Sequence, residues 1–267
     1  MGLLIDCATT FIDNYVWLIH DESTRQTAAI DPGQAEPVLA VLKRRGWRLD
    51  WILNTHHHRD HTGANIILKV ETGCRIAGAA IDQHRIPGMD HPLHDGDRLC
   101  VGGSCAQVLL TPGHTNGHLC FWFAHDQALF CGDTLFSLGC GRLSEGDAQT
   151  MLRSLERLAR LPGETRIFCA HEYTQANGCF ARTVDPDNAA LMARLAEVDQ
   201  HRAVGLPTIP QQLAIELATN PFLRTSDPQI TSSLGLHGES PEKVFATLRA
   251  RKDQFHPNAG GSSFSIR

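Results

Sequence analysis

A short histidine-rich segment, residues 55–63, constrains this chain more than any other part of its sequence. It directly follows an apolar run at 51–53, which we predict to be a strand, and leads into a helix predicted over about 62–71. Residues at i and i+2 do not share a helix face, so we expect His56 and His58 in a loop or at a strand end. In α/β proteins, ligands bind where a strand gives way to a helix. The segment therefore predicts a ligand site on an α/β fold.

The residue types in this segment are those that bind metal ions. His56, His58, Asp60 and His61 offer three imidazoles and a carboxylate within six residues. One catalytic metal with an open position takes fewer ligands than that from so short a stretch, so we predict two metal ions that share the loop. His57 lies between ligands, and we expect its side chain to point away from them.

Three further candidate ligands each follow a predicted buried strand. His114 follows the strand expected at 106–110, Asp133 the one at 128–130, and His171 the one at 166–170. Regular topology would place all three at the same edge of the sheets, with the carboxylate of Asp133 bridging the two metals. The first metal would then be bound by three histidines, His56, His58 and His114. The second would be bound by a mixed set, Asp60, His61 and His171.

Length and composition indicate an ordinary globular protein. The chain has 267 residues, of which 42% are hydrophobic and 20% charged, with a net charge of -5. No global basic field would attract nucleic acid or an anionic membrane, and no run is long and apolar enough for a membrane span. The N-terminus has an acid at Asp6 and no basic region before its short apolar run, so we expect a cytoplasmic protein. Its nine cysteines lack a C-x-x-C pair and are expected to be buried, reduced thiols.

The chain divides into two parts by its patterns. Up to about residue 170, short apolar runs alternate with helical periodicity, which indicates a layered α/β domain; helices are predicted at 36–45 and 148–160. After Tyr173 only helices and turns are expected, at 188–202, within 207–221 and at 241–254. We therefore predict an α/β domain over 1–173, which holds the candidate ligands, and a smaller all-helical domain over 174–267.

The H-x-H-x-D-H pattern with a later His, Asp and His resembles the metallo-β-lactamase superfamily. A closer similarity, to the glyoxalase II (hydroxyacylglutathione hydrolase) family, covers nearly the whole chain. It rests on residues 13–15, 111–115, 132–136, 139–141, 171–174, 220–224 and 252–255. The resemblance implies an αββα sandwich with a dinuclear site at one edge and a smaller helical C-terminal domain.

The resemblance also implies roles for individual residues. The seven candidate ligands fall on the family's metal positions, and Asp60 or Asp133 would in addition orient the nucleophile. Glutathione-binding positions fall on Arg142, Ser144, Tyr173, Arg249 and Lys252. Arg142 keeps a positive charge where many relatives have lysine, whereas Ser144 stands where an aromatic residue is common. Because glutathione carries two carboxylates and the chain is acidic overall, local cations are needed, and residues 249 and 252 share a helix face.

The implied activity is metal-dependent hydrolysis of the thioester S-D-lactoylglutathione, and of related 2-hydroxyacylglutathiones, to D-lactate and glutathione. This is the second step of methylglyoxal detoxification. Two divalent ions are expected, zinc foremost, with iron or manganese also suited to the ligands. The partner would be this small-molecule substrate, with no nucleic acid or membrane, and the protein a monomer.

Three alternatives stay open on the sequence. A mononuclear iron persulfide dioxygenase of the same superfamily also handles glutathione adducts, although such relatives usually lack the helical domain. Another hydrolase of this fold, a nuclease or a lactonase, would use the same ligands. A structural zinc module ranks last, because closed structural sites favour cysteine-rich sets.

Overall fold

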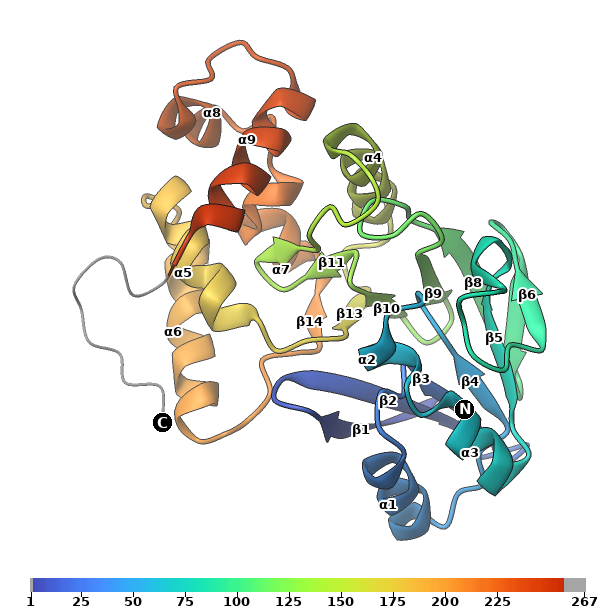
Figure 1. Ribbon diagram of the computed structural model, residues 1–267. Coiled ribbons are helices and arrows are strands. Elements are labelled where there is room, and N and C mark those ends of the chain that lie inside the picture. Colours follow the sequence, from blue (N-terminus) through green and yellow to red (C-terminus); the bar gives the residue numbers. More distant parts are fainter. Residues whose placement is uncertain (1, 257–267) are drawn as a thin grey trace.

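The computed structural model describes residues 2–256, which form two six-stranded sheets and a helical C-terminal region (Figure 1). The first sheet contains, in order, β1 (Leu4–Thr10), β2 (Asn14–Asp21), β3 (Gln26–Ile30), β4 (Trp51–Leu53), β5 (Arg75–Ala79) and β6 (His91–Leu93). The second contains, in order, β14 (Gln211–Gln212), β13 (Arg166–Cys169), β10 (Ala128–Gly132), β9 (Leu119–Phe123), β8 (Ser104–Leu110) and β7 (Arg98–Val101).

Strand β2 shows why the sheets stack as they do. All eight of its residues are buried, and alternate side chains point to opposite faces. Trp17 and Ile19 join the core between the two sheets, whereas Val16 and Leu18 join a second core under the helices. A strand covered on both faces needs this nearly continuous apolar run.

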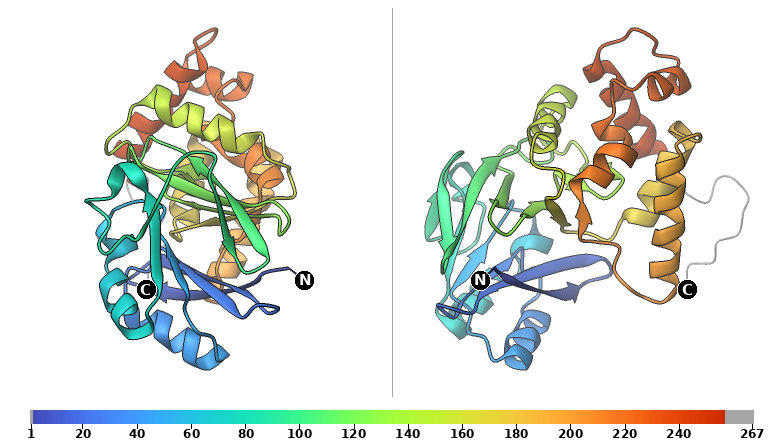
Figure 2. Two further views of the ribbon diagram at one scale, coloured as in Figure 1. Left: turned by 90° about the vertical axis from the view of Figure 1, so that its right-hand side faces the viewer. Right: turned by 180° about the vertical axis from the view of Figure 1, so that it is seen from behind.

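Helices cover the outer face of each sheet. Helices α1 (Ala35–Arg45) and α3 (Asn65–Thr72) pack on the first sheet, and α4 (Ala148–Ala159) lies over the second (Figure 2). Helix α1 ends as predicted, at Gly46 in the left-handed conformation. The layers are thus helix, sheet, sheet, helix, and the predicted αββα fold is confirmed.

The C-terminal region is largely helical, as predicted. Its helices are α5 (Thr174–Val184), α6 (Ala189–Ala203), α7 (Leu213–Thr219), η2 (Pro221–Leu223), α8 (Pro228–Leu234) and α9 (Pro241–Gln254). The expectation of no strand after Tyr173 is wrong, because β14 pairs antiparallel with β13. This two-residue strand consists of glutamines and has no apolar alternation that a sequence pattern could reveal. The domain division at 173/174 stays a prediction.

The helical region docks on a small hairpin, β11 (Leu135–Phe136) and β12 (Gly139–Cys140), through buried polar contacts. The carboxylate of Glu216 accepts hydrogen bonds from Ser137 Oγ at 2.7 Å and Leu138 N at 2.8 Å. Asn220 Nδ2 donates to the carbonyls of Phe136 and Gly139 at 3.1 and 3.0 Å. These contacts place the helices beside the loops that follow β10 and β12.

Two expectations need correction. The cysteines are not all reduced, because Cys100 and Cys105 form a disulfide across the β7–β8 hairpin, where their Cα atoms lie 3.9 Å apart as directly paired residues. Nor are all the others buried: Cys179 is exposed and Cys7 half-buried.

The predicted helix over 62–71 is divided into α2 (Arg59–Thr62) and α3, because the histidine-rich segment makes its own turn first.

No helix among residues 2–256 is long and apolar enough to cross a membrane.

Candidate metal centre

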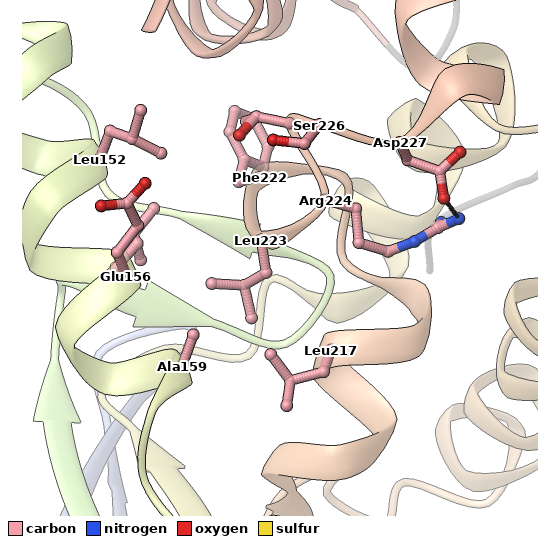
Figure 3. A pocket seen from close by; sticks show the side chains of 11 residues that line it. Leu152, Glu156, Ala159, Leu217, Phe222, Leu223, Arg224, Ser226 and Asp227 are labelled. Carbon is pink, nitrogen blue, oxygen red and sulfur yellow. Dashed lines mark hydrogen bonds and ion pairs between the residues drawn. The ribbon is translucent and has the colours of Figure 1, made fainter. Parts of the chain in front are cut away.

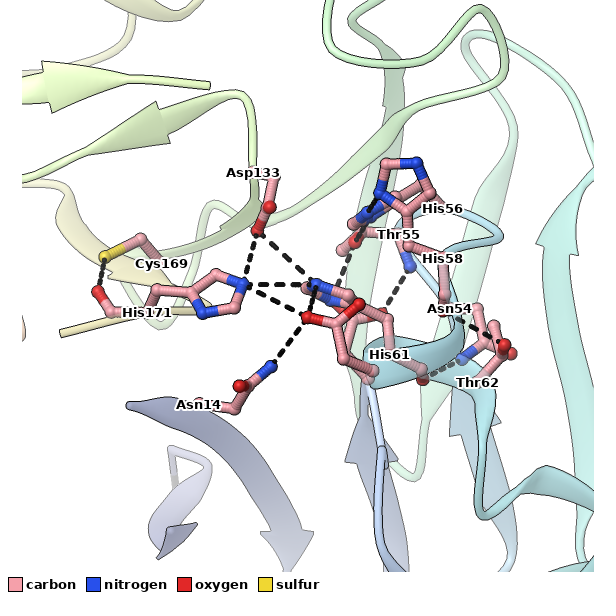
Figure 4. A network of polar contacts seen from close by, with 12 residues as sticks. Asn14, Asn54, Thr55, His56, His58, His61, Thr62, Asp133, Cys169 and His171 are labelled. Atoms are coloured by element: carbon pink, nitrogen blue, oxygen red, sulfur yellow. Dashed lines mark hydrogen bonds and ion pairs between the residues drawn. The ribbon is translucent and has the colours of Figure 1, made fainter. Parts of the chain in front are cut away.

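The loops that follow β4, β8, β10 and β13 converge at one edge of the two sheets. Figure 4 shows His56, His58 and His61 on one side, with Asp133 and His171 facing them from the second sheet. Sequence reasoning predicted seven ligands, and the structure brings all seven into this region. They form two groups of three, His56, His58 and His114, and Asp60, His61 and His171, with Asp133 between them.

In the first group, three ring nitrogens meet. His58 Nδ1 lies 3.0 Å from His56 Nε2 and 3.0 Å from His114 Nε2. On its far side, His114 Nδ1 donates to the carbonyl of Arg142 at 2.8 Å, so its Nε2 holds a lone pair. Burial lowers the pKa of His56 well below its usual value, and burial and His114 lower that of His58 to about 4. Neutral imidazoles with converging lone pairs are suited to bind a metal ion.

The second group has a different electrostatic character. His61 Nε2 lies 3.3 Å from His171 Nε2 and 3.3 Å from Asp60 Oδ2. His171 Nδ1 donates to Asp13 Oδ1 at 2.9 Å, which turns its Nε2 lone pair inward. Burial alone would lower the pKa of His61, but the carboxylate of Asp133 and others raise it well above its usual value. This group therefore gathers carboxylates around its imidazoles.

Asp133 lies between both groups. Its Oδ2 is 3.5 Å from His114 Nε2, and its Oδ1 is 3.4 Å from His171 Nε2 and 3.6 Å from His61 Nε2. Burial would raise the pKa of Asp133, but His61 and His171 outweigh it and lower that pKa. Oδ1 is buried without a hydrogen-bond partner in the described part of the chain. A buried carboxylate oxygen without a hydrogen-bond donor is favourable beside a positive charge, so this set of imidazoles and carboxylates fits metal ions.

A ring of further residues holds these ligands in place. Asp31, at the end of β3, accepts hydrogen bonds from Thr55 N at 2.7 Å and Thr55 Oγ1 at 2.6 Å, and its Oδ2 lies 3.2 Å from His61 Nδ1. His118 Nε2 accepts from Asp133 N at 3.0 Å. A Cβ on Gly132, whose φ is +47°, would lie 2.3 Å from Thr55 Oγ1. Only glycine therefore lets β10 approach the histidine loop this closely.

Sequence reasoning missed Asp31 as part of the site, although it groups with His56 and His61 within ligand distance. Its sequence signal was a polar residue directly after the apolar run of β3. That run pairs in parallel with β4, so both strands end at the same edge. Asn14 was also not predicted as a site residue; its Nδ2 donates to Asp60 Oδ2 at 3.0 Å.

The five predicted glutathione-binding residues fall into two groups. Tyr173 is 37% exposed and stacks on His171 with ring centroids 4.8 Å apart, so it borders the metal centre. Arg142 and Ser144 are exposed on the loop that holds His114. Lys252 is half-buried, and burial, Arg249 and Arg142 lower its pKa to about 8. Arg142 and Lys252 are the positively charged members of this set of four, which we refer to as the rim.

Arg249, the fifth residue, is buried in contacts within the chain. It is 5% exposed, and its guanidinium already donates to Asp253 Oδ1 at 2.8 and 3.1 Å and to the carbonyl of Cys140 at 2.9 Å. Its bond to the carbonyl of Cys140 attaches α9 to β12. Glutathione binding by Arg249 stays a prediction.

A cavity of about 390 Å³ lies elsewhere, between α4 and the segment around η2 (Figure 3). Leu152, Glu156, Phe222 and Arg224 are among its lining residues, none of which was predicted as a site residue. Its Arg224 pairs with Asp185 and Asp227. This cavity is separate from the metal centre.

Comparisons with known proteins agree with this arrangement. Residues 3–171 match the family model described as "Metallo-beta-lactamase superfamily", and residues 172–255 match "Hydroxyacylglutathione hydrolase C-terminus". Two solved structures share the fold. The crystal structure of BLEG-1 B3 metallo-beta-lactamase is 22% identical, with a TM-score of 0.64 over 83% of this chain and 100% of that one. That of TTHA1623 in a di-iron-bound form is 27% identical, with a TM-score of 0.60 over 81% of this chain and 98% of that one.

Relatives of similar length are much closer in sequence. The hydroxyacylglutathione hydrolase of Methylococcus capsulatus is 57% identical over 91% of this chain and 95% of its own length. That of Rhodospirillum rubrum is 52% identical over the same shares. The chain belongs to the hydroxyacylglutathione hydrolase family, within the metallo-beta-lactamase superfamily.

Proposed function

We propose that this protein hydrolyses 2-hydroxyacylglutathione thioesters, S-D-lactoylglutathione foremost, to the hydroxy acid and glutathione. The observation that carries the proposal is the position of Asp133, within 3.6 Å of ligand nitrogens from both histidine groups. One carboxylate shared by two ligand sets is suited to a pair of metal ions that act on one substrate. The close relatives over nearly the whole chain support the glutathione thioester as that substrate.

We assign His56, His58 and His114 to the first metal ion, Asp60, His61 and His171 to the second, and Asp133 to both. The mixed imidazole and carboxylate set suits zinc, iron or manganese, and we propose zinc as the native metal. A similar solved structure is described as a di-iron-bound form, so iron is the competing assignment. When bound, such ions lower the pKa of water and polarise a carbonyl oxygen.

The side chains around the centre have separate tasks in this reaction. Asp60 keeps one carboxylate face available: its side chain is 43% exposed, and its Oδ2 is oriented by Asn14 Nδ2. His61 is the main group that lowers the pKa of Asp60 against its burial, so Asp60 stays ionised. Asp60 and Asp133 would accept a hydrogen bond from the attacking water and orient it toward the thioester carbon.

The rim binds and orients the glutathione part. Arg142 and Lys252 provide positive charge for its carboxylates, and Tyr173 provides an aromatic wall beside His171. Ser144, exposed on the same loop, can donate one hydrogen bond but provides no such wall. The thiolate of glutathione leaves without a general acid, since a thiol pKa is only about 8.5.

The test is hydrolysis of S-D-lactoylglutathione, followed at the thioester absorbance, with metal content measured on the same batch. We expect turnover with two metal ions per chain, loss of both with a chelator, and recovery when metal is returned. An inactive protein that holds two metals would overturn the substrate assignment. A single iron with oxygen uptake on glutathione persulfide would replace the proposal with the dioxygenase alternative.

A further inference from the structure

A polar cluster outside the ligand set lies against the first histidine group. It consists of Asp82, at the end of η1 (Ala80–Asp82), with Arg85, His57 and Glu145, and we refer to it as the Arg85 cluster. Arg85 is at its centre: Nη1 donates to Asp82 Oδ1 at 3.3 Å, and Nη2 lies 2.5 Å from both His57 Nε2 and Glu145 Oε1. One guanidinium thus joins three separate segments of the chain.

The first of these segments is the histidine loop itself. Because Arg85 donates to His57 Nε2, the ring proton of His57 is on Nδ1, which lies 3.3 Å from Asp82 Oδ2. His57 is therefore held at both ring nitrogens, and it points away from the metal centre as predicted. Its chain neighbours are His56 and His58. Contacts that hold the His57 ring therefore also hold the backbone turn that orients those two side chains.

The second segment is the loop that carries Glu145. Glu145 Oε2 accepts from Asn116 N at 2.8 Å, and Glu145 N lies 3.3 Å from the carbonyl of His114. The same loop supplies the carbonyl of Arg142 that accepts from His114 Nδ1. Arg85 thus reaches the third ligand of the first group through Glu145.

The packing beneath the cluster leaves little freedom. The side chain of Asp82 is 2% exposed, and a Cβ on Gly117 would lie 2.2 Å from Asp82 Oδ2. The loop over 111–118, which carries His114, therefore packs directly on this carboxylate. The second group has no link to the cluster among the contacts described: His61 lies beside Asp31, and His171 is held by Asp13.

We propose that Arg85, together with Asp82, is a positioning residue for the first metal site, acting through His57 and Glu145 on His56, His58 and His114. This inference rests on the proposed function, because it requires that the first group binds metal. It assigns no contact with substrate or metal to Arg85. Removal of a residue that orients metal ligands typically lowers the affinity for the metal 10–100-fold.

The test compares stepwise metal affinities of apo-protein, measured by competition with a chromophoric chelator for zinc. R85Q and D82N should weaken one of the two affinities about tenfold or more and leave the other within about twofold. K69Q is the control, because Lys69, 35% exposed against 45% for Arg85, forms an ion pair with Asp90 away from the ligands. Thermal unfolding of the apo-proteins checks that all variants are folded.

Double variants identify the affected site. In H171A the remaining strong affinity belongs to the first group, and R85Q should lower it; in H114A the remaining affinity belongs to the second group, and R85Q should not change it. The proposal is overturned if R85Q alters neither affinity, lowers both equally, or behaves like K69Q. An unaltered chain that binds neither zinc, iron nor manganese would refute the proposed function and this inference together, whereas two normal affinities in R85Q refute the inference alone.

Discussion

Asp13 Oδ1 accepts a hydrogen bond from His171 Nδ1 at 2.9 Å, across 158 positions of sequence. This bond joins the turn between β1 and β2 to the loop after β13. The matching nitrogen of His114 donates instead to a main-chain carbonyl, that of Arg142, which no side-chain substitution removes. The orientation of the His171 ring is therefore more open to mutation than that of the His114 ring.

We expect D13A to weaken metal binding at the second site about 10–100-fold, because His171 loses the partner that fixes its ring and tautomer. Competition titration of the apo-protein with zinc measures this. D187A, at an exposed aspartate between α5 and α6, is the control and should leave both affinities unchanged. Equal affinities in D13A and the unaltered chain would contradict the assigned role.

Lys252 should make substrate binding dependent on pH. Its pKa is lowered to about 8 by burial, Arg249 and Arg142, so it is charged below that pH and loses its charge above it. Because the substrate is anionic, KM should rise as the pH increases through about 8. At neutral pH, K252Q should have a KM about tenfold higher than the unaltered enzyme, because it loses a charged hydrogen bond worth roughly 1.5 kcal/mol. The KM of K252Q should not rise further as the pH increases.

Steady-state kinetics on both sides of pH 8 measure this effect. R251Q, on the same helix, is the control and should keep the rise in KM. A KM that stays constant through this range in the unaltered enzyme would show that Lys252 does not bind the substrate.

Asp21 should link stability to acid pH at a point remote from the metal centre. Its carboxylate accepts from Gly103 N at 2.7 Å and from Ser23 and Thr24, which joins the end of β2 to the β7–β8 turn of the other sheet. These bonds outweigh its burial and hold its pKa below the usual 3.8. A lowered folded-state pKa adds stability above the unfolded pKa, and this stability is lost as the pH falls below it.

D21N should therefore lose about 1–3 kcal/mol of unfolding free energy at neutral pH. The difference from the unaltered chain should shrink as the pH falls below 3.8, because the aspartate of the unfolded chain then takes up a proton that the native carboxylate binds only at lower pH. Urea unfolding at several pH values measures it. If the difference in unfolding free energy does not change with pH, the loss of stability in D21N comes from altered packing and not from the lost charge.

Glu216 is expected to determine whether the helical region docks. Its side chain is fully buried, burial raises its pKa, and it accepts from Ser137 Oγ and Leu138 N. E216L leaves these donors buried without an acceptor and should cost roughly 3 kcal/mol or more of unfolding free energy. E216Q keeps one acceptor oxygen and should lose clearly less; equal losses would indicate that packing alone is responsible. Urea unfolding of the two variants at neutral pH measures both losses.

Local patterns were sufficient for the layered fold and for the residue types of the site. The apolar run of β2 requires cover on both faces, and the spacing of His56 and His58 excludes a shared helix face. Strand β14 was missed because its two glutamines pair only through main-chain groups. The disulfide was missed because the cross-strand pairing of Cys100 and Cys105 depends on hairpin register, which cysteine spacing does not specify.

The sequence by itself determined which chemistry is available: imidazoles and carboxylates at strand ends, and cations on a C-terminal helix. Only the tertiary structure decided how these groups are used. It buried Arg249 against Asp253 and left Lys252 half-buried. It also placed Asp31 beside the ligand His61, and Arg85 beside His57, the chain neighbour of two ligands. The reason is physical: residue type and local periodicity specify what a side chain can donate or accept, whereas its partners and burial depend on contacts between distant segments.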